Sequence, residues 1–314
     1  MSAPAPGFHS GFVSILGRPN AGKSTLLNVL VGGKLAAVSE KPQTTRTTVE
    51  GVLHMDHGQV IFMDTPGIHE SDTLLNRRMM QTVRSALQDR DLLLYLADAA
   101  APFTDPDAQA LDVIRNVSTP TLLVLTKIDR VPDKRQLLLR IEQYKTLRDF
   151  AEFIPISAVT GEGLDGLRRA IFSRLPEGPA YFPADYLTDQ PERFLAAELI
   201  RERVMRETRQ EVPHAVAVLV DEWKESPNLT RIAATIYVER DGQKAILIGS
   251  KGAMMKKIGT LARQEMQTLF ARKIHLEMFV KVQKDWRDNP EFLRMIDWRS
   301  MRGGELDTEP NSDS

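Results

Sequence analysis

The sequence predicts a two-domain protein, with an α/β domain built on a mostly parallel sheet followed by a smaller α+β domain. Strand-like apolar runs alternate with helical patterns through the first 175 residues, which is typical of a parallel sheet covered by helices on both faces. A proline-rich stretch then interrupts the alternation, and the order of elements changes after it. The length of 314 residues also agrees with about two domains.

The first domain, residues 8–175, is expected to contain six strands and five helices. Apolar strands are predicted at 12–16, 60–63, 92–97, 122–125 and 153–156, with a weaker alternating strand at 49–55. Helical patterns fall between them at 24–31, 74–88, 105–117, 133–148 and 163–174. Thr104 or Asp105 can cap the third helix, with Pro106 at its first position.

Residues 176–192 contain four prolines and no period, and they are predicted to be a linker between domains. The second domain, 193–287, begins with a helix, followed by two strands and a short apolar helix or strand. A longer helix and a final strand complete it, and the six elements are expected at 193–210, 214–223, 229–239, 244–248, 253–270 and 274–283. The polar, acidic segment 288–314 is predicted to be a disordered tail.

The composition excludes several classes of protein. With 42% hydrophobic and 26% charged residues, the chain is expected to be globular rather than disordered. It has no apolar run long enough to cross a membrane, and its first residues do not resemble a secretory signal. The absence of cysteine excludes disulfides, thiolate metal sites and a cysteine nucleophile, and it fits a reducing cytoplasm.

The formal net charge of −1 conceals one strongly basic segment. Residues 240–287 hold 11 basic and 4 acidic side chains, and the segments on both sides of them are acidic. Such a basic segment is typical of a polyanion-binding surface, although a solvated helix face could also produce it.

The segment Gly17-Arg-Pro-Asn-Ala-Gly-Lys-Ser24 follows an apolar strand and precedes a predicted helix. This is the pattern and the context of a phosphate-binding P-loop, and a plain glycine turn is the alternative. Lys23 is expected to reach the outer phosphates and Ser24 to bind Mg²⁺. The candidate nucleotide contacts here are Gly17, Arg18, Pro19, Asn20, Ala21, Gly22, Lys23, Ser24 and Thr25.

Asp64-Thr65-Pro66-Gly67 follows the predicted strand 60–63. A carboxylate at the end of a strand can hold Mg²⁺ through water, and the Gly67 N–H is expected to contact the γ-phosphate. Taken alone, this tetrapeptide would be a turn. Its position about forty residues after the P-loop favours a nucleotide site that includes Asp64, Thr65, Pro66, Gly67 and Ile68.

Two further segments predict recognition of guanine. Thr126-Lys127-Ile128-Asp129 follows an apolar strand, and the Asp129 carboxylate can accept hydrogen bonds from the N1–H and 2-amino groups of guanine, a donor pair that adenine lacks. Ser157-Ala158 follows the last strand of the domain, where a backbone N–H could bind the guanine oxygen. Ligands bind at the carboxyl ends of parallel strands, so all these motifs are expected at one edge of the sheet.

The set GRPNAGKS, PQTTRT, DTPG, TKID and SA resembles the Era GTPases of the TrmE–Era–EngA group, from about residue 10 to 287. The resemblance implies that Thr45, or else the adjacent Thr44, is the switch threonine that binds Mg²⁺. It therefore implies that Ser24, Thr45 and Asp64 hold the metal. The residues implied to act in catalysis are Lys23, Thr45, Asp64 and Gly67.

Three positions differ from the general GTPase pattern or vary within it. Ile68 stands where many regulatory GTPases place a water-orienting glutamine, which implies slow intrinsic hydrolysis that uses other groups. Thr126 replaces the commoner asparagine, and guanine specificity is expected to survive on Asp129. Asn20 matches the asparagine that potassium-stimulated members of this group use as a K⁺ ligand, unless it only favours the turn.

In the second domain, Gly249-Ser250-Lys251-Gly252 lies between an apolar stretch and a helix, inside the basic segment. A GXXG loop between two helices approaches nucleotide phosphates closely in KH domains, and the element order resembles the type II KH domain of Era. Ile246, Ile248 and Ile258 are expected to face the bases. The predicted RNA-binding residues are Ile248, Gly249, Ser250, Lys251, Gly252, Lys256 and Lys257.

The resulting hypothesis is a monomeric GTP-hydrolysing switch that binds structured RNA. The resemblance implies binding near the 3′ end of 16S rRNA, a part in small-subunit maturation, and a cytoplasmic location with peripheral association to the inner membrane. A metabolic P-loop ATPase or nucleotide kinase with an accessory domain is the alternative, which Lys127 and Asp129 disfavour because they point to guanine.

Overall fold

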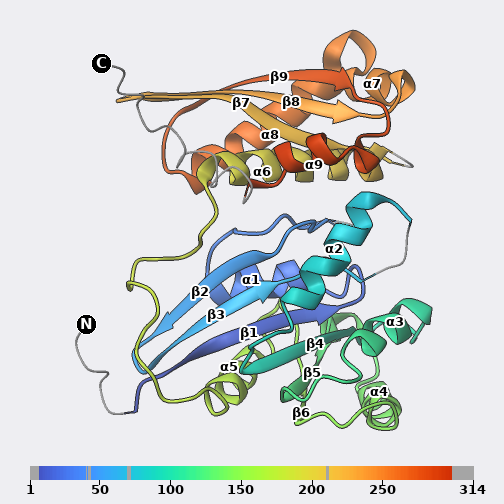
Figure 1. The fold of residues 1–314 in the computed structure, drawn as a ribbon, viewed down its shortest axis with the longest axis vertical. Helices are drawn as coiled ribbons and strands as arrows, with labels where there is room; N and C mark the ends of the chain where they lie inside the picture. The colour runs from blue at the N-terminus through green and yellow to red at the C-terminus, as the bar shows by residue number, and fades with distance from the viewer. Residues whose placement is uncertain (1–6, 40, 42–43, 69–71, 210–211, 299–314) are drawn as a thin grey trace, which may run out of the picture. The chain divides into compact units, whose positions relative to one another are not determined.

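The computed structural model describes residues 7–39, 41, 44–68, 72–209 and 212–298, and it shows the predicted two-domain architecture (Figure 1). The chain divides into two compact units between Asp189 and Gln190, apart from residues 72–77, which group with the second unit. Each unit is described by itself below.

The first unit contains a six-stranded sheet in the order β2-β3-β1-β4-β5-β6. All neighbouring strands are parallel except the edge strand β2, which forms an antiparallel pair with β3. The mostly parallel sheet expected from the sequence is therefore confirmed. The strands are β1 (His9–Gly17), β2 (Val49–Met55), β3 (Gly58–Asp64), β4 (Leu92–Asp98), β5 (Thr121–Thr126) and β6 (Glu152–Pro155).

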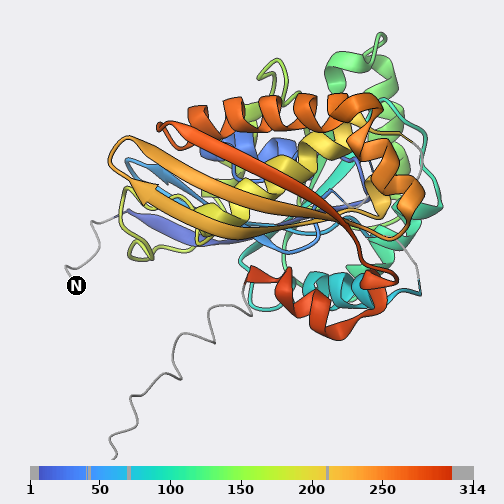
Figure 2. The same cartoon turned by 90° about the horizontal axis from the view of Figure 1, so that it is seen from above.

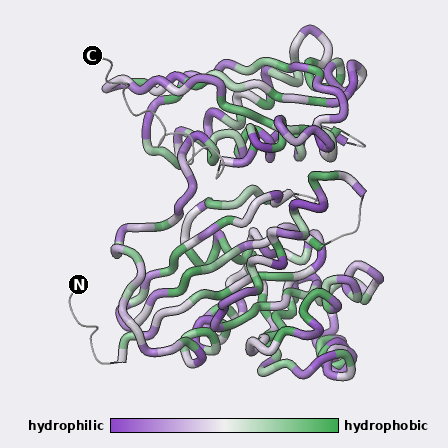
Figure 3. The backbone as a smooth tube through the Cα atoms, in the orientation of Figure 1, coloured by the Kyte–Doolittle hydropathy of each residue, from purple (hydrophilic) through white to green (hydrophobic). Residues whose placement is uncertain are grey.

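Helices cover both faces of this sheet. On one face, α1 (Lys23–Val31) and α5 (Leu164–Phe172) bury leucine and isoleucine side chains against the strands. On the other face, α2 (Leu74–Ser85), α3 (Asp105–Val113) and α4 (Arg135–Lys145) pack around Tyr95. The central strands are buried on both faces, which is why they are almost continuously apolar, as the colouring of Figure 3 shows.

The strand register brings the predicted motifs to one edge of the sheet. Ile15 of β1 is paired with Asp64 of β3, and Asp98 of β4 is paired with Thr126 of β5. The chain leaves each of these strands at its carboxyl end, so the loops that follow β1, β3, β4 and β5 lie together. This edge is where an open parallel sheet binds its ligands.

The linker is anchored to the first unit rather than free. Gln59 of β3 is fully buried, and its side-chain oxygen accepts hydrogen bonds from the backbone N–H groups of Tyr181 (2.7 Å) and Phe182 (3.0 Å). The N–H of Val52 donates to Leu187 O at 2.9 Å, and the Thr188 hydroxyl donates to Glu50 O at 2.6 Å. Residues 181–188 therefore cover the otherwise open edge strand β2.

The second unit is a three-stranded sheet with helices on one face (Figures 1 and 2). Its strands lie in the order β7-β8-β9, with β7 and β8 antiparallel and β8 and β9 parallel. The strands and principal helices are α6 (Glu192–Glu207), β7 (Ala217–Ser226), β8 (Leu229–Val238), α7 (Asp241–Ile248), α8 (Ala253–Leu269) and β9 (Ile274–Val282). The apolar segment 244–248, which the sequence left open between helix and strand, is helical. Short 3₁₀ turns occur in the second unit at η2 (Val212–His214), η3 (Ser250–Gly252) and η4 (Trp286–Asp288). The first unit has one as well, η1 (Ile128–Arg130).

The prediction of a disordered tail from residue 288 is wrong for its first eleven residues. The segment includes helix α9 (Pro290–Met295), which begins after the capping residue Asn289. Phe292, Leu293 and Trp298 are buried, and Trp286 just before the segment is buried with its indole N–H donating to Ala215 O at 3.0 Å. The prediction of disorder was based on the average composition of 288–314, which is polar and acidic, and it therefore overlooked these apolar side chains. The rest of the predicted tail, 299–314, lies outside the described residues.

Candidate functional site

The phosphate loop is the turn between β1 and α1. Gly22 precedes α1 with a φ of 95°, in the left-handed region that favours glycine. The Lys23 ammonium is buried beneath the loop and donates to Gly17 O at 3.1 Å and to Arg18 O at 2.9 Å. Burial lowers the pKa of Lys23 to about 8, although the nearby Asp64 carboxylate acts in the opposite direction. The charge is thus held at the centre of the loop that the sequence identified.

Three oxygen-bearing side chains that lie apart in the sequence meet beside this loop. The Ser24 hydroxyl donates to Asp64 Oδ2 at 2.7 Å and lies 2.7 Å from the Thr45 hydroxyl, which is itself 3.4 Å from Asp64 Oδ2. The neighbouring Thr44 instead donates to Lys41 O at 2.7 Å. Of the two threonines that the sequence left open, Thr45 is therefore the one placed with Ser24 and Asp64. Pro42 and Gln43 of the same motif lie outside the described residues.

This arrangement fits a magnesium ion. Asp64 Oδ1 is buried and has no hydrogen-bond partner among the described residues, so one carboxylate oxygen is available to a ligand. Burial raises the pKa of Asp64 to about 6, and Lys23 and the Ser24 and Thr45 hydroxyls act against that shift. Hydroxyl and carboxylate oxygens are ligands that Mg²⁺ prefers, so Ser24, Thr45 and Asp64 would hold it. When bound there with GTP, the metal neutralises charge on the phosphates.

The segment after Asp64 approaches the phosphate loop closely. A Cβ atom on Gly67 would lie 2.9 Å from Pro19 Cα, so no larger residue fits here without moving the loop. The next side chain, Ile68, is only 2% exposed and packs among core residues of the first unit. An apolar side chain in this position cannot polarise water, in agreement with the sequence analysis.

The guanine-side segments are connected to the phosphate loop by hydrogen bonds. The Thr126 hydroxyl donates to Ala21 O at 2.7 Å and to Ala97 O at 3.2 Å, and the Lys127 ammonium donates to Asn20 O at 2.7 Å. Asp129 lies in η1 with its side chain exposed, accessible to a base. In the second segment the Ser157 N–H donates to Glu162 O at 2.9 Å, which leaves the N–H of Ala158 for the guanine oxygen.

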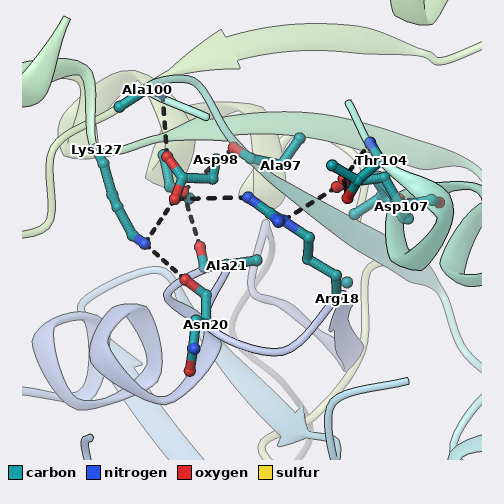
Figure 4. A network of polar contacts seen from close by, with 12 residues as sticks. Arg18, Asn20, Ala21, Ala97, Asp98, Ala100, Thr104, Asp107 and Lys127 are labelled. Atoms are coloured by element: carbon teal, nitrogen blue, oxygen red, sulfur yellow. Dashed lines mark hydrogen bonds and ion pairs between the residues drawn. The ribbon is translucent and has the colours of Figure 1, made fainter. Parts of the chain in front are cut away.

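Sequence reasoning missed two carboxylates at this edge, Asp98 and Asp107. Asp98 ends β4 and lies 2.7 Å from the Lys127 ammonium (Figure 4). Asp107 lies in the first turn of α3, and its Oδ1 is 3.2 Å from Nε of Arg18. Arg18 was predicted to bind nucleotide, but its side chain extends toward these two aspartates. The sequence could have indicated Asp98, because it directly follows the predicted apolar strand 92–97 just as Asp64 follows the predicted strand 60–63.

The second candidate site is the turn between α7 and α8. Gly249 has a φ of 69°, and a Cβ atom there would lie 2.8 Å from the Cβ of Met254, so the close turn requires glycine. Ser250 and Lys251 are exposed at the tip, and Ile246 and Ile248 of α7 are exposed beside it. A loop of this kind with exposed apolar neighbours is the surface that KH domains offer to single-stranded RNA.

One expectation for this surface is wrong, and one of the predicted lysines has an ion-pair partner within the chain. Ile258 was predicted to face the bases, but it is fully buried in the core between the helices and the sheet. Lys256 and Lys257 are both exposed, but the Lys257 ammonium is paired with Glu207 of α6 at 2.5 Å. Successive helical residues point about 100° apart, so the two adjacent lysines project in different directions from α8. Lys251 and Lys256 are the two predicted lysines without an ion pair to a described residue.

The geometry therefore combines a phosphate loop, a metal-binding oxygen set and a guanine-side carboxylate in one unit with a GXXG loop in the other. Comparisons with known proteins agree with this combination. The family described as "50S ribosome-binding GTPase" matches residues 12–127, and the KH domain family matches residues 211–287.

Whole-chain similarity is high. The GTPase Era of Syntrophus aciditrophicus is 50% identical over 289 residues, covering 91% of this chain and 94% of that protein. The GTPase Era of Geobacter metallireducens is 49% identical over 291 residues, with 92% and 97% covered.

Solved structures lead to the same family. A variant of Aquifex aeolicus Era bound to GDP and AlF4⁻ matches with a TM-score of 0.88 and 39% identity, over 93% of this chain and 99% of that one. A structure of Era in complex with MgGDPNP and nucleotides 1506–1542 of 16S ribosomal RNA matches with the same values. Within the described part of this chain, every helix is too short or too polar to span a bilayer. From its nucleotide site, its KH domain and these likenesses, the chain belongs to the Era family of GTPases.

Proposed function

We propose that this GTPase is a nucleotide-controlled switch that binds the 3′ region of 16S ribosomal RNA through its second unit and assists maturation of the small ribosomal subunit. The observation that carries the proposal is the pairing of the phosphate loop, the metal-site oxygens and Asp129 with an exposed GXXG loop in one chain. Support comes from the Era structure that holds both MgGDPNP and a 16S rRNA segment. The first unit alone matches a family named for the 50S ribosome, so the 16S rRNA segment in that Era structure is the reason for preferring the small subunit.

Binding of a 37-nucleotide RNA, equivalent to the 1506–1542 segment of that structure, tests the proposal. We expect the Ser250→Asp/Lys251→Asp variant to lose RNA affinity, because carboxylates at the loop tip repel phosphates at contact distance. A Lys224→Asp variant, on the exposed end of β7, is the control for negative charge added away from the loop and should bind nearly as the parent chain does. Equal affinity in the loop variant, measured by fluorescence anisotropy, would show that 249–252 is only a turn.

Salt dependence separates the two adjacent lysines. Lys256→Ala is expected to reduce the slope of log affinity against log salt by about 0.7, the value for one lost phosphate contact on a single strand. Lys257→Ala should change the slope less, because that ammonium is already paired with Glu207. Equal slopes for the two variants would contradict the placement of the lysines.

We infer K⁺ as a second cation from the position of Asn20 in the loop. Its backbone is in the left-handed region, with a φ of 63°, and its carbonyl accepts from Lys127. The side chain points away from the charged residues around Asp98 in Figure 4. Turnover measured in KCl and in NaCl tests the inference, with Asn20→Ala expected to remove any difference between the two salts. Equal rates for the parent chain in both salts would eliminate the K⁺ site.

For the rest, the family resemblance supports a monomer in the cytoplasm that associates peripherally with the inner face of the cell membrane. Fractionation of cells and the sedimentation behaviour of the purified chain test these two proposals. A stable dimer, or a chain found entirely in the soluble fraction, would contradict one or the other.

A further inference from the structure

Four charged side chains lie together at the carboxyl ends of the strands of the first unit, beside the phosphate loop. Arg18 of the phosphate loop lies 3.2 Å from Asp107 and 3.8 Å from Asp98, and Asp98 also lies 2.7 Å from Lys127. The side chains of Arg18, Asp98 and Asp107 are only 18%, 10% and 3% exposed. Two cations and two carboxylates thus form a balanced network in a poorly solvated position (Figure 4).

The direction of Arg18 is the informative feature. A cation in a phosphate-binding loop is expected to face the phosphates, as Lys23 does from the centre of the loop. The Arg18 side chain instead leaves the loop on the side of β4 and α3, and both of its carboxylate partners lie there. Its charge therefore stabilises the position of the loop and contributes little direct attraction to the nucleotide.

Asp98 connects three loops at one carboxylate. Its Oδ2 lies beside Lys127, which follows β5, and beside Arg18, which follows β1, and Asp98 itself ends β4. Lys127 completes the connection, because its ammonium also donates to Asn20 O of the phosphate loop. The segment that carries the guanine-binding Asp129 and the loop that binds the phosphates are thereby held at a constant separation.

We propose that Asp98 and Asp107 are positioning residues for nucleotide binding, which act through Arg18 and Lys127. A loop that is already ordered before the nucleotide arrives loses less conformational entropy on binding. Removing one partner leaves the other charge uncompensated in a poorly solvated position, which destabilises the arrangement of the loop that carries it. Loss of either carboxylate should therefore weaken GDP and GTP alike.

Asp98→Asn is the first test, because its side-chain oxygen can still accept the hydrogen bond that the Ala100 N–H makes to Asp98 Oδ1 at 3.0 Å. On the other side of the carboxylate an NH2 group replaces Oδ2, so the negative charge that faces Lys127 and Arg18 is lost together with the acceptor of the Lys127 ammonium. We expect the Kd for GDP, measured by calorimetry, to rise about tenfold, with a similar rise for a non-hydrolysable GTP analogue. In steady-state hydrolysis, KM should rise by a larger factor than kcat falls, because the lost interaction is the same in ground and transition states.

Asp107 needs a control for helix stability, since it also caps α3. Its Oδ2 accepts from the Thr104 N–H at 3.0 Å and from the Thr104 hydroxyl at 2.8 Å. Asp107→Asn keeps an oxygen for Thr104 but turns an amide toward Arg18, whereas Thr104→Ala removes a capping hydrogen bond and leaves the Arg18 pair intact. We expect Asp107→Asn to raise the Kd for GDP about fivefold and Thr104→Ala to change it by less than about twofold.

A double-mutant cycle measures the coupling between Arg18 and Asp107 directly, and it adds a test that does not depend on one variant alone. Arg18→Gln loses the pairs with both Asp98 and Asp107, so it should weaken GDP binding at least as much as Asp107→Asn does. The Arg18→Gln/Asp107→Asn double variant should bind about as weakly as Arg18→Gln alone, because the pair with Asp107 is already lost in the single variant. Hydrogen exchange of the amides of residues 17–22 should be faster in each of them than in the Thr104→Ala variant. Additive losses in the cycle, or equal losses in Asp107→Asn and Thr104→Ala, would overturn the proposal.

Discussion

At the scale of single residues, two adjacent threonines have different fates although nothing in their own chemistry separates them. Thr45 lies with Ser24 and Asp64, and Thr44 bonds to the backbone of Lys41. The direction of the chain before β2 decides between them. Two adjacent lysines differ in the same way. Both are exposed, but Lys257 is paired with Glu207 and Lys256 has no ion pair to a described residue.

The exposed carboxylate of Asp129 is predicted to set the preferred base. We expect Asp129→Asn to shift preference from GTP toward XTP, because an amide presents a donor where guanine also presents one, while xanthine presents an oxygen. Competition between the two nucleotides for the purified chain measures the shift. Asp133→Asn, on a partly exposed aspartate four residues away, serves as the control. A variant with the original margin for GTP would place the base elsewhere.

The buried side chain of Ile68 affects stability more than chemistry. We expect Ile68→Ala to lower the free energy of unfolding by about 2–4 kcal/mol, the usual cost of a cavity in a core. Turnover by the folded fraction should fall much less than in Asp64→Ala, which loses a metal ligand. Val83→Ala makes a cavity in the same core and is the control for stability. If Ile68→Ala slows hydrolysis as strongly as Asp64→Ala does, the isoleucine controls access of water.

At the scale of elements, the linker behaves as part of the first unit. Prolines prevent residues 176–192 from forming a helix, but backbone groups of 181–188 still bond to β2 and β3. An edge strand with unpaired backbone groups invites association with another chain. Residues 181–188 cover β2 and so remove that risk. The second unit begins shortly after this segment, at Gln190.

Gln59 is the residue that holds this linker. We expect Gln59→Ala to lower the free energy of unfolding by about 2 kcal/mol, because buried backbone groups of Tyr181 and Phe182 lose a partner. The linker should also become sensitive to limited proteolysis at low protease concentration. Asp185→Ala, at an exposed linker position, should change neither measurement. A resistant linker in the Gln59→Ala chain would show that the other hydrogen bonds are sufficient.

At the scale of the whole molecule, charge and chemistry are divided between the two units. The first carries the nucleotide site and has almost equal numbers of acidic and basic residues, whereas the basic segment 240–287 lies in the second. RNA affinity is therefore expected to depend strongly on salt, and nucleotide affinity much less so.

Reciprocal variants test that division. Lys23→Ala should abolish GTP binding, because no other described cation lies inside the phosphate loop, and it should leave affinity for the RNA within about twofold of the parent chain. The Ser250→Asp/Lys251→Asp chain should show the opposite pattern. If Lys23→Ala weakens RNA binding in the absence of any nucleotide, the two sites are coupled through the chain itself.

Much of this molecule could be predicted from local patterns. The alternation of apolar strands and helices, the P-loop between a strand and a helix, and the GXXG loop between two helices all depend on neighbours within about twenty residues. Those patterns located the sheet, both binding loops and the division into units. They failed at 288–298, where an acidic average concealed Phe292, Leu293 and Trp298.

Only the tertiary structure decided which side chains meet. Lys127 and Asn20 are 107 residues apart, and the partners of Arg18 lie on β4 and α3. No local pattern encodes such pairings, because they follow from strand order and register. The sequence by itself therefore predicted a guanine nucleotide site and an RNA-binding loop and located both. Folding decided that Arg18 faces Asp98 and Asp107, that Thr45 rather than Thr44 faces the metal site, and that Ile258 is core. In each case the cause is a contact between residues that lie apart in the sequence and that the fold brings together.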